Sequence, residues 1–317
     1  MSSKIITLQK GKIIYMQEGR KIFITGANGQ LGRDLVSELT RRGVVCTASD
    51  IQGEFSGSEA CEYIQLDITD SNAVEHAVTT TQPERVIHCA AWTAVDAAED
   101  DANRPKVYAV NVTGTENIAR ACAKSDIVMT YISTDYIFNG EGAEAWKPED
   151  ESYSPLNYYG QTKLEGELAV KKYLQKFFIV RIAWVFGRNG NNFVRTMLKL
   201  AQTHDTLRVV NDQIGTPTYT PDLARLLADM NDTDKFGIYH ATNEGGFISW
   251  YDFAREIFAQ AGVSVNVIPV TTAEYGASKA KRPNNSRLDK TKLTASGFLP
   301  LPDWRDALRR YLANGTD

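Results

Sequence analysis

Cysteine is scarce in this sequence, and its spacing does not suggest a metal site or a disulfide framework. The four cysteines show no Cys-x-x-Cys spacing and lie in or beside apolar segments. Such residues behave as small buried hydrophobes in a reducing compartment, so we expect free thiols in a cytoplasmic protein. The cysteines are Cys46, Cys61, Cys89 and Cys122.

Histidine clusters, long apolar runs and an excess of one charge are also missing. The four histidines are scattered, so we expect them to be structural and predict no metal site. No apolar run approaches the ~20 residues that cross a bilayer. The 35 basic and 39 acidic residues give a net charge of -4, and the basic residues do not cluster. This argues against binding to nucleic acid or to an anionic membrane as the main function. The histidines are His76, His88, His204 and His240.

The sequence divides into a short N-terminal extension and two larger parts. Residues 1–20 lack the long apolar core of a signal peptide, and we interpret them as a loosely held extension. We expect a dinucleotide-binding domain at residues 21–184 and a smaller substrate-binding lobe at residues 185–317. We also expect some of the chain after residue 185 to return to the sheet of the first domain.

Short apolar strands alternate with amphipathic helices along residues 21–184. Such alternation requires right-handed crossovers and a parallel sheet covered by helices on both faces. The predicted fold class is therefore α/β, with a doubly wound parallel sheet. The strands are predicted at residues 21–25, 44–48, 63–66, 85–89, 127–132 and 177–182, and the helices at 31–42, 71–79 and 106–123.

After residue 184 the alternation weakens, which predicts a smaller mixed α/β lobe over the carboxyl edge of the sheet, where ligands bind in such folds. To this lobe we assign short strands at residues 207–210 and 237–240. The helices assigned to it span residues 192–202, 221–230, 250–261 and 302–311.

A glycine-rich turn follows the first strand, at residues 26–32 (GANGQLG). Between a strand and a helix, this spacing predicts a nest of backbone N–H groups that binds a pyrophosphate. The motif residues are Gly26, Gly29, Gln30, Leu31 and Gly32.

Two aspartates follow later strands and are predicted to complete the dinucleotide site. Asp50 can accept hydrogen bonds from the adenosine ribose, and Asp67-Ile68 suits the adenine edge, although each aspartate could instead cap a loop. Asp50 should repel a 2′-phosphate, and we expect the helix to point Arg33 away from the ribose. We therefore expect both NADH and NADPH to serve.

A Tyr-x-x-x-Lys pair at Tyr159 and Lys163 places a phenol and an ammonium on one face of a helix. An ammonium and an oxidised nicotinamide nearby would lower the pKa of the phenol and make it an acid–base group. Ser133 and Thr134 offer a hydroxyl to a substrate oxygen. The pair recurs at Tyr275 and Lys279, in the stretch TAEYGASK late in the chain, and we interpret this second copy as a surface coincidence.

Taken together, these stretches resemble the extended short-chain dehydrogenase/reductases and, within them, the dTDP-4-dehydrorhamnose reductase family, from about residue 21 to the C-terminus. The matching stretches are GANGQLG at 26–32, AAWTAVD at 90–96, STDYIF at 133–138, SPLNYYGQTK at 154–163, RIAWVFG at 181–187, GNNFV at 190–194, DQIGTPT at 212–218 and RPNNS at 282–286.

The resemblance implies NADPH- or NADH-dependent reduction of dTDP-4-dehydro-L-rhamnose to dTDP-L-rhamnose for surface polysaccharide synthesis. It implies Tyr159 as the proton donor, Lys163 as its electrostatic helper and a ligand of the cofactor, and Thr134 as the partner of the substrate oxygen. Further cofactor contacts are implied at Ala91, Trp92 and Thr93. The implied substrate contacts are Val95, Thr134, Asp135, Trp184, Asn192, Gln213, Thr218 and Arg282.

Some family members bind magnesium through glutamates at a dimer contact, one of them just after the glycine motif. Here that neighbourhood reads Gly32-Arg33-Asp34-Leu35, which does not support a magnesium site; either a monomer or a homodimer is compatible with the sequence.

Two alternative functions stay open. One is a nucleotide-sugar epimerase or dehydratase of the same fold with tightly bound NAD, although the glutamate typical of dehydratases is missing after Asp135. The other is a non-catalytic cofactor-binding regulatory subunit.

Overall fold

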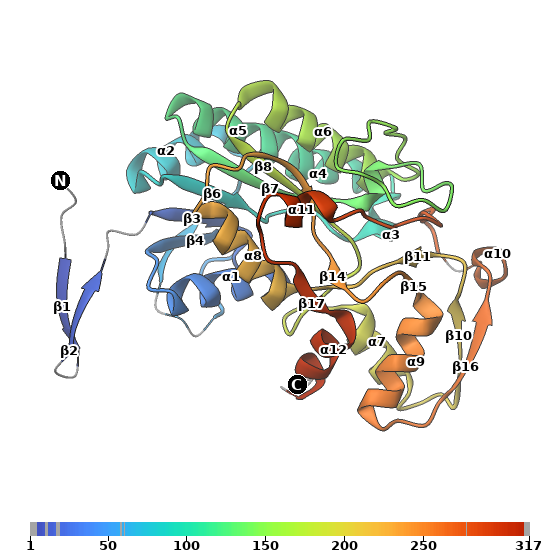
Figure 1. The fold of residues 1–317 in the computed structure, drawn as a ribbon. Helices are drawn as coiled ribbons and strands as arrows, with labels where there is room; N and C mark the ends of the chain where they lie inside the picture. The colour runs from blue at the N-terminus through green and yellow to red at the C-terminus, as the bar shows by residue number, and fades with distance from the viewer. Residues whose placement is uncertain are drawn as a thin grey trace.

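A seven-stranded parallel sheet forms the centre of the fold (Figure 1). The structure is a computed structural model that describes residues 5–9, 12–16, 20–57, 59, 61–276 and 278–313. The strand order is β13-β8-β7-β6-β3-β4-β5, so the chain reverses its direction of winding between β3 and β6. The strands are β3 (Ile22–Thr25), β4 (Cys46–Asp50), β5 (Glu62–Gln65), β6 (Arg85–His88), β7 (Val128–Thr134), β8 (Phe177–Ile182) and β13 (Gly237–His240).

This topology confirms the predicted doubly wound sheet, because every neighbouring pair of strands in it is parallel. Ligands bind at the carboxyl edge of such a sheet, where the strand order reverses. Within the N-terminal extension, β1 (Ile5–Gln9) pairs antiparallel with β2 (Lys12–Met16). The other residues before Arg20 lie outside the described part, and the predicted looseness of the extension stays a prediction.

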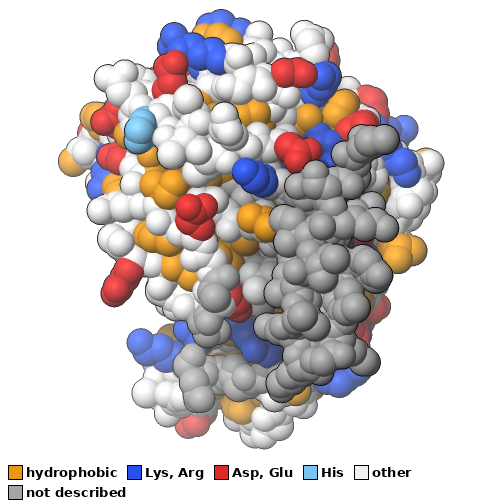
Figure 2. Space-filling model, turned by 90° about the vertical axis from the view of Figure 1, so that its left-hand side faces the viewer, with side chains coloured by type: hydrophobic (Ala, Val, Ile, Leu, Met, Phe, Trp, Pro, Cys, Tyr) orange, Lys and Arg blue, Asp and Glu red, His pale blue; other side chains and the backbone are white. Residues whose placement is uncertain are grey.

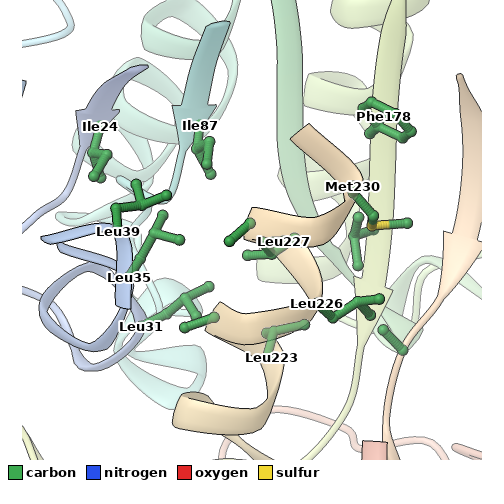
Figure 3. Close-up of a cluster of buried hydrophobic side chains, with 14 of the residues drawn as sticks. Ile24, Leu31, Leu35, Leu39, Ile87, Phe178, Leu223, Leu226, Leu227 and Met230 are labelled. Carbon is green, nitrogen blue, oxygen red and sulfur yellow. The ribbon is translucent and has the colours of Figure 1, made fainter. Parts of the chain in front are cut away.

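Helices α1 (Gln30–Arg41) and α8 (Thr220–Asn231) cover one face of the sheet. Figure 3 shows their leucines packed between the helices and the strands, with Leu35 and Leu227 among them. Leu31, Leu35 and Leu39 are all buried, as expected for one apolar face of a helix.

The opposite face is covered by α2 (Ser71–Thr81), α5 (Thr115–Lys124) and α6 (Tyr158–Tyr173), which lie together above the sheet in Figure 1. The prediction of one continuous α-helix at 106–123 is wrong. The segment consists of α4 (Arg104–Tyr108), a π-helical turn (Ala109–Gly114) and α5. Such turns occur mostly within α-helices and frequently at functional sites.

A second lobe is built on its own hydrophobic cluster, which includes Phe253, Trp304 and Tyr311. Its parallel strands β10 (Thr206–Val210) and β16 (Asn266–Val270) pair apart from the main sheet. Its helices are α7 (Phe193–Leu200), α9 (Trp250–Ala261) and α12 (Trp304–Ala313).

The assignment of residues 221–230 and 237–240 to this lobe needs correction. β13 pairs in parallel with β8 in the main sheet, and α8 packs on α1. The strand is only four residues long, so its sequence carries no periodic signal for its partner. The chain therefore returns to the sheet, as expected, but through these elements.

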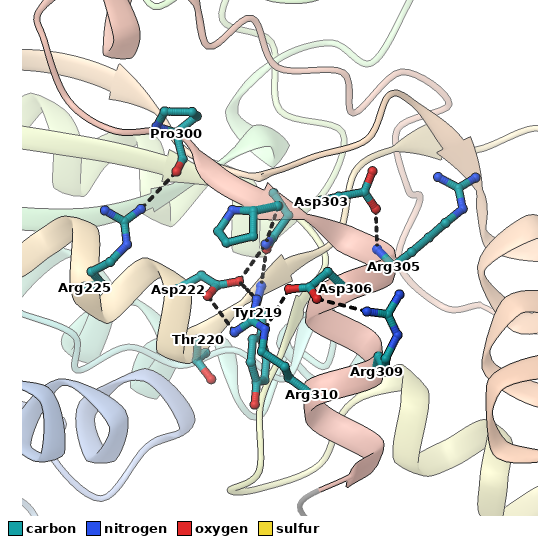
Figure 4. A network of polar contacts seen from close by, with 12 residues as sticks. Tyr219, Thr220, Asp222, Arg225, Pro300, Asp303, Arg305, Asp306, Arg309 and Arg310 are labelled. Carbon is teal, nitrogen blue, oxygen red and sulfur yellow. Dashed lines mark hydrogen bonds and ion pairs between the residues drawn. The ribbon is translucent and has the colours of Figure 1, made fainter.

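A partly buried polar network ties the C-terminal helix α12 to α8 (Figure 4). The Arg310 guanidinium donates two hydrogen bonds to the Asp222 carboxylate, at 2.8 and 2.7 Å. Asn243 donates to the same carboxylate at 2.8 Å and accepts from the Tyr219 backbone N–H at 2.7 Å. These bonds hold the end of the chain against the helices beside the sheet.

The face in Figure 2 mixes basic, acidic and apolar side chains. In the part of the chain that the structure describes, no helix combines the length and apolar character needed to cross a membrane.

Candidate active site

The glycine turn leaves no room for larger residues at two of its positions. Gly26 has φ +69° and a Cβ there would collide with the backbone of Ala90, while a Cβ on Gly32 would collide with the Gly26 carbonyl. Helix α1 begins directly after Gly29 with no side-chain cap on its first N–H groups. These N–H groups, with the positive end of the helix dipole, form the expected anion-binding site.

A cleft of about 330 Å³ opens beside this turn and contains most of the residues predicted to bind a dinucleotide. Leu31 turns its side chain into the core instead, so only its backbone can face a phosphate. The predicted residues that line the cleft are Gly26, Gly29, Asp50, Asp67, Ile68, Ala91 and Trp92, and sequence reasoning missed Lys106 and Val110.

Both aspartates of the cleft also hold its loops. Asp50 Oδ2 accepts the Asn28 N–H at 3.0 Å, and Asp67 Oδ1 accepts the Thr69 N–H at 2.9 Å. Arg33 donates to Asn189 Oδ1 at 3.0 Å and to the Ser56 hydroxyl, so its guanidinium contacts the loop that follows Asp50. Asp50 and Asp67 thus cap loops, as the alternative interpretation expected, and both also line the cleft.

Asn111 is a site residue that sequence reasoning missed. It lies in the π-helical turn, accepts the Trp92 N–H at 2.8 Å and donates to the Trp92 carbonyl at 3.2 Å. It also donates to Thr162 Oγ1 on α6 at 3.0 Å. Asn111 therefore holds the cofactor-lining loop against α6, and its only sequence signal was an amide between Val110 and Val112.

Tyr159, Lys163 and Thr134 come together at the carboxyl end of β7. The expected Asn cap is confirmed, because Asn157 Oδ1 accepts the Gly160 N–H at 2.8 Å and starts α6 beside β7. A hydrogen bond joins the side chains of Tyr159 and Thr134. Lys163 Nζ donates to the Ile132 carbonyl at 2.8 Å.

The pKa of the Tyr159 phenol is raised, whereas the sequence analysis expected Lys163 to lower it. Burial, followed by the charge of Asp135, raises the pKa of Tyr159 well above its ordinary value, while the Thr134 hydrogen bond opposes the shift. Burial lowers the pKa of Lys163 to about 7. The ammonium lies over the Tyr131 ring at 4.0 Å and bonds a carbonyl, so in this structure it does not lower the pKa of the phenol.

Comparison with known proteins places these features in a family. Residues 20–316 match the family model described as the RmlD substrate binding domain. The chain is 39% identical over 306 residues to a dTDP-4-dehydrorhamnose reductase of Aggregatibacter actinomycetemcomitans, covering 92% of this chain and 98% of that protein. The chain belongs to the dTDP-4-dehydrorhamnose reductase family.

Other relatives agree with this membership. The chain is 38% identical over 292 residues to the spore coat polysaccharide biosynthesis protein SpsK of Bacillus subtilis, covering 92% of this chain and 96% of that one. A crystal structure of dTDP-4-dehydrorhamnose reductase from Bacillus anthracis in complex with NADP matches with a TM-score of 0.85 and 38% identity. That match covers 94% of this chain and 100% of the other.

In this family member, several predicted substrate contacts already have protein partners. Arg282 forms an ion pair with Asp96 at 2.7 Å. Asn192 caps α7 through the Arg195 N–H at 3.0 Å, Gln213 donates to Thr272 at 3.1 Å, and Thr218 donates to the Ala183 carbonyl at 2.6 Å. Their roles as substrate contacts stay predictions, as does that of Val95 at the start of a short helix (Val95–Ala98).

The second Tyr-x-x-x-Lys match lies apart from this site. Tyr275 is 44% exposed at the end of α10 (Thr272–Tyr275), and Gly276 ends that helix in a left-handed conformation. Tyr275 and Lys279 therefore do not share a helix face, as the surface interpretation expected.

Asp34, two residues after the last glycine of the motif, accepts a hydrogen bond from Thr220, and burial raises its pKa to about 6. Within the described residues, no group of three histidine, cysteine, aspartate or glutamate side chains is arranged to hold a metal ion.

Trp184 is the predicted substrate contact with the most unusual geometry. Its φ of +50° lies in the left-handed region, which costs a bulky residue ~1–3 kcal/mol. Its half-buried ring stacks on Trp250 at 3.7 Å. Strain held by surrounding contacts and a partly open ring favour a ligand-facing role.

Replacing Trp184 with Phe tests this role. We expect a higher KM for the sugar nucleotide with little change in thermal stability, because Phe keeps a ring on Trp250 and loses only the wider indole face. Steady-state kinetics and thermal unfolding measure the two effects. A lower melting temperature with unchanged KM would make Trp184 a core residue.

Proposed function

We propose that this protein reduces the C4 keto group of dTDP-4-dehydro-L-rhamnose with NADPH or NADH, giving dTDP-L-rhamnose. The observation that carries the proposal is the convergence of Tyr159, Lys163 and Thr134 beside the dinucleotide cleft. Relatives over nearly the whole chain are named for this reaction, and one was crystallised with NADP.

The residues of the cleft fit a dinucleotide. Gly26 and Gly32 let a pyrophosphate approach the open N–H groups of α1, and Asp50 can accept from a ribose hydroxyl. When bound, the cofactor supplies the hydride, since no side chain can. Tyr159 donates its proton to the carbonyl oxygen, and its high pKa keeps that proton in place until charge develops.

Lys163 and Thr134 assist this step in different ways. Lys163, one helical turn from Tyr159 on α6, is the residue that would bind the ribose hydroxyls of the nicotinamide and so hold the cofactor beside the phenol. The Thr134 hydroxyl polarises the same carbonyl oxygen.

To test the function, purified protein is incubated with NADPH and dTDP-4-dehydro-L-rhamnose. The amount of NADPH oxidised and the amount of dTDP-L-rhamnose formed are then measured. We expect one NADPH oxidised for each dTDP-L-rhamnose formed. Product without net oxidation would indicate an epimerase or dehydratase. Cofactor binding without turnover would indicate a regulatory subunit, a role that gives the converging Tyr159, Lys163 and Thr134 no task.

For cofactor choice we expect a preference of less than about tenfold between NADH and NADPH. Asp50 repels a 2′-phosphate, but a solvent-screened contact between like charges costs only ~1 kcal/mol, about fivefold in affinity. Initial rates with each cofactor measure the preference. A preference for NADPH above about a hundredfold would show that a cation such as Arg33 binds the phosphate and would contradict the role of Asp50.

The proposal includes a cytoplasmic enzyme with a small-molecule substrate, acting as a monomer or a homodimer. The absence of a membrane-crossing helix among the described residues is compatible with this setting.

A further inference from the structure

Asp135, the residue after Thr134, is buried at the centre of the site and its carboxyl group is only partly hydrogen-bonded. It is 1% exposed and starts the single 3₁₀ turn (Asp135–Ile137) that follows β7. Its Oδ1 accepts the Thr134 hydroxyl at 3.0 Å, while its Oδ2 has no hydrogen-bond partner among the described residues. A buried carboxylate with an unpartnered oxygen is unfavourable, and a proton on it relieves the cost.

The hydrogen bonds of Thr134 conflict with the role that the reaction gives it. A hydroxyl has one proton and two acceptor positions. An ionised Asp135 can only accept, so the Thr134 proton would have to point to Asp135 Oδ1, 3.0 Å away, while the Tyr136 N–H donates to the hydroxyl oxygen at 3.2 Å. The second acceptor position of the Thr134 oxygen then remains, and it can only accept a hydrogen bond. The Tyr159 phenol would donate its proton there, so neither Thr134 nor Tyr159 would donate to the substrate carbonyl.

We propose that Asp135 works in its protonated form, donating to Thr134 so that Thr134 and Tyr159 both donate to the carbonyl oxygen. With the acid as donor, Thr134 accepts from Asp135 and from Tyr136 and its own proton is free. Asp135 is thus a positioning residue that sets the direction of the Thr134 hydroxyl. This inference rests on the proposed reduction, because only a carbonyl substrate needs both donors.

The surroundings of Asp135 favour the neutral acid. The phenols of Tyr136 and Tyr159 and the Ser286 hydroxyl face it, and Arg282, beyond Tyr136, is paired with Asp96. Burial raises the pKa of Asp135 to about 7, more than the nearby hydroxyl groups of Ser286 and Thr134 lower it. Reduction should therefore be fast below that pKa and slow as Asp135 ionises.

The test compares the pH dependence of kcat, at saturating NADPH and substrate, in the wild type and in Asp135→Asn. Asparagine donates to Thr134 at every pH. We expect kcat of the wild type to fall about tenfold per pH unit above roughly pH 7, and Asp135→Asn to lose this decline while remaining active. Asp126→Asn is the matched control, because Asp126 is 81% exposed just before the opposite end of β7, and it should follow the wild type.

A decline that persists in Asp135→Asn with the same midpoint would overturn the inference and assign the titration to Lys163. Loss of activity in a folded Asp135→Asn would overturn it as well. If Asp135→Asn does not fold, Thr134→Ala decides, since its residual activity should lack the decline and Thr134→Ser should restore it. A wild type that cannot reduce the substrate at any pH would contradict the proposed function instead.

Discussion

Replacing Tyr159 with Phe is expected to lower kcat by ~10²–10⁴ while cofactor affinity changes little. The substitution keeps the ring, which packs edge-on to Tyr136 at 5.9 Å, and removes only the proton that the carbonyl oxygen must receive. Steady-state kinetics measure kcat, and titration of NADPH fluorescence measures binding.

Tyr275→Phe is the matched control, because it makes the same change in the second Tyr-x-x-x-Lys match on an exposed helix end. Its kinetics should equal those of the wild type. Equal damage from the two substitutions would remove Tyr159 from the mechanism.

The largest expected loss of stability comes from breaking the buried ion pair between Glu167 and Arg181. The guanidinium donates to both carboxylate oxygens at 2.9 Å, and both side chains are 0% exposed. Glu167→Ala leaves an uncompensated buried charge, which should lower the free energy of unfolding by ~3–5 kcal/mol. Urea denaturation measures this change.

Glu75→Ala provides the comparison for that experiment. Glu75 pairs with Lys124 at 2.7 Å, but the side chains are 54% and 58% exposed, so the loss should stay below ~1 kcal/mol. Similar losses from the two substitutions would show that the buried pair contributes no more than a surface one.

The fold could be predicted from the sequence wherever a segment carried its own periodic pattern. The strand before Gly26, the helix with Leu31, Leu35 and Leu39, and the parallel sheet all follow from local signals. The return of β13 to the sheet could not be predicted, because it depends on pairing with β8, which lies far away in sequence.

Some residues of the site could likewise be predicted from the sequence, whereas others are defined only by the packed structure. The turn at Gly26 follows from a motif whose spacing fixes its geometry, whereas the convergence of Tyr159 with Thr134 could be predicted only from the family resemblance. Asn111 acts through hydrogen bonds to groups on other elements, and Asp135 is buried by the packing around it; a single amide or carboxylate in the sequence reveals neither. The shift in the pKa of Lys163 likewise arises from burial that only the packed structure defines.

The central claim is that a hydride passes from the cofactor to C4 of the sugar with net oxidation of the cofactor. The most direct measurement reduces dTDP-4-dehydro-L-rhamnose with NADPH that carries deuterium at the transferable position of the nicotinamide. We expect dTDP-L-rhamnose with one deuterium at C4 and one oxidised cofactor per product. Product without deuterium, formed while the cofactor stays reduced, would contradict the account.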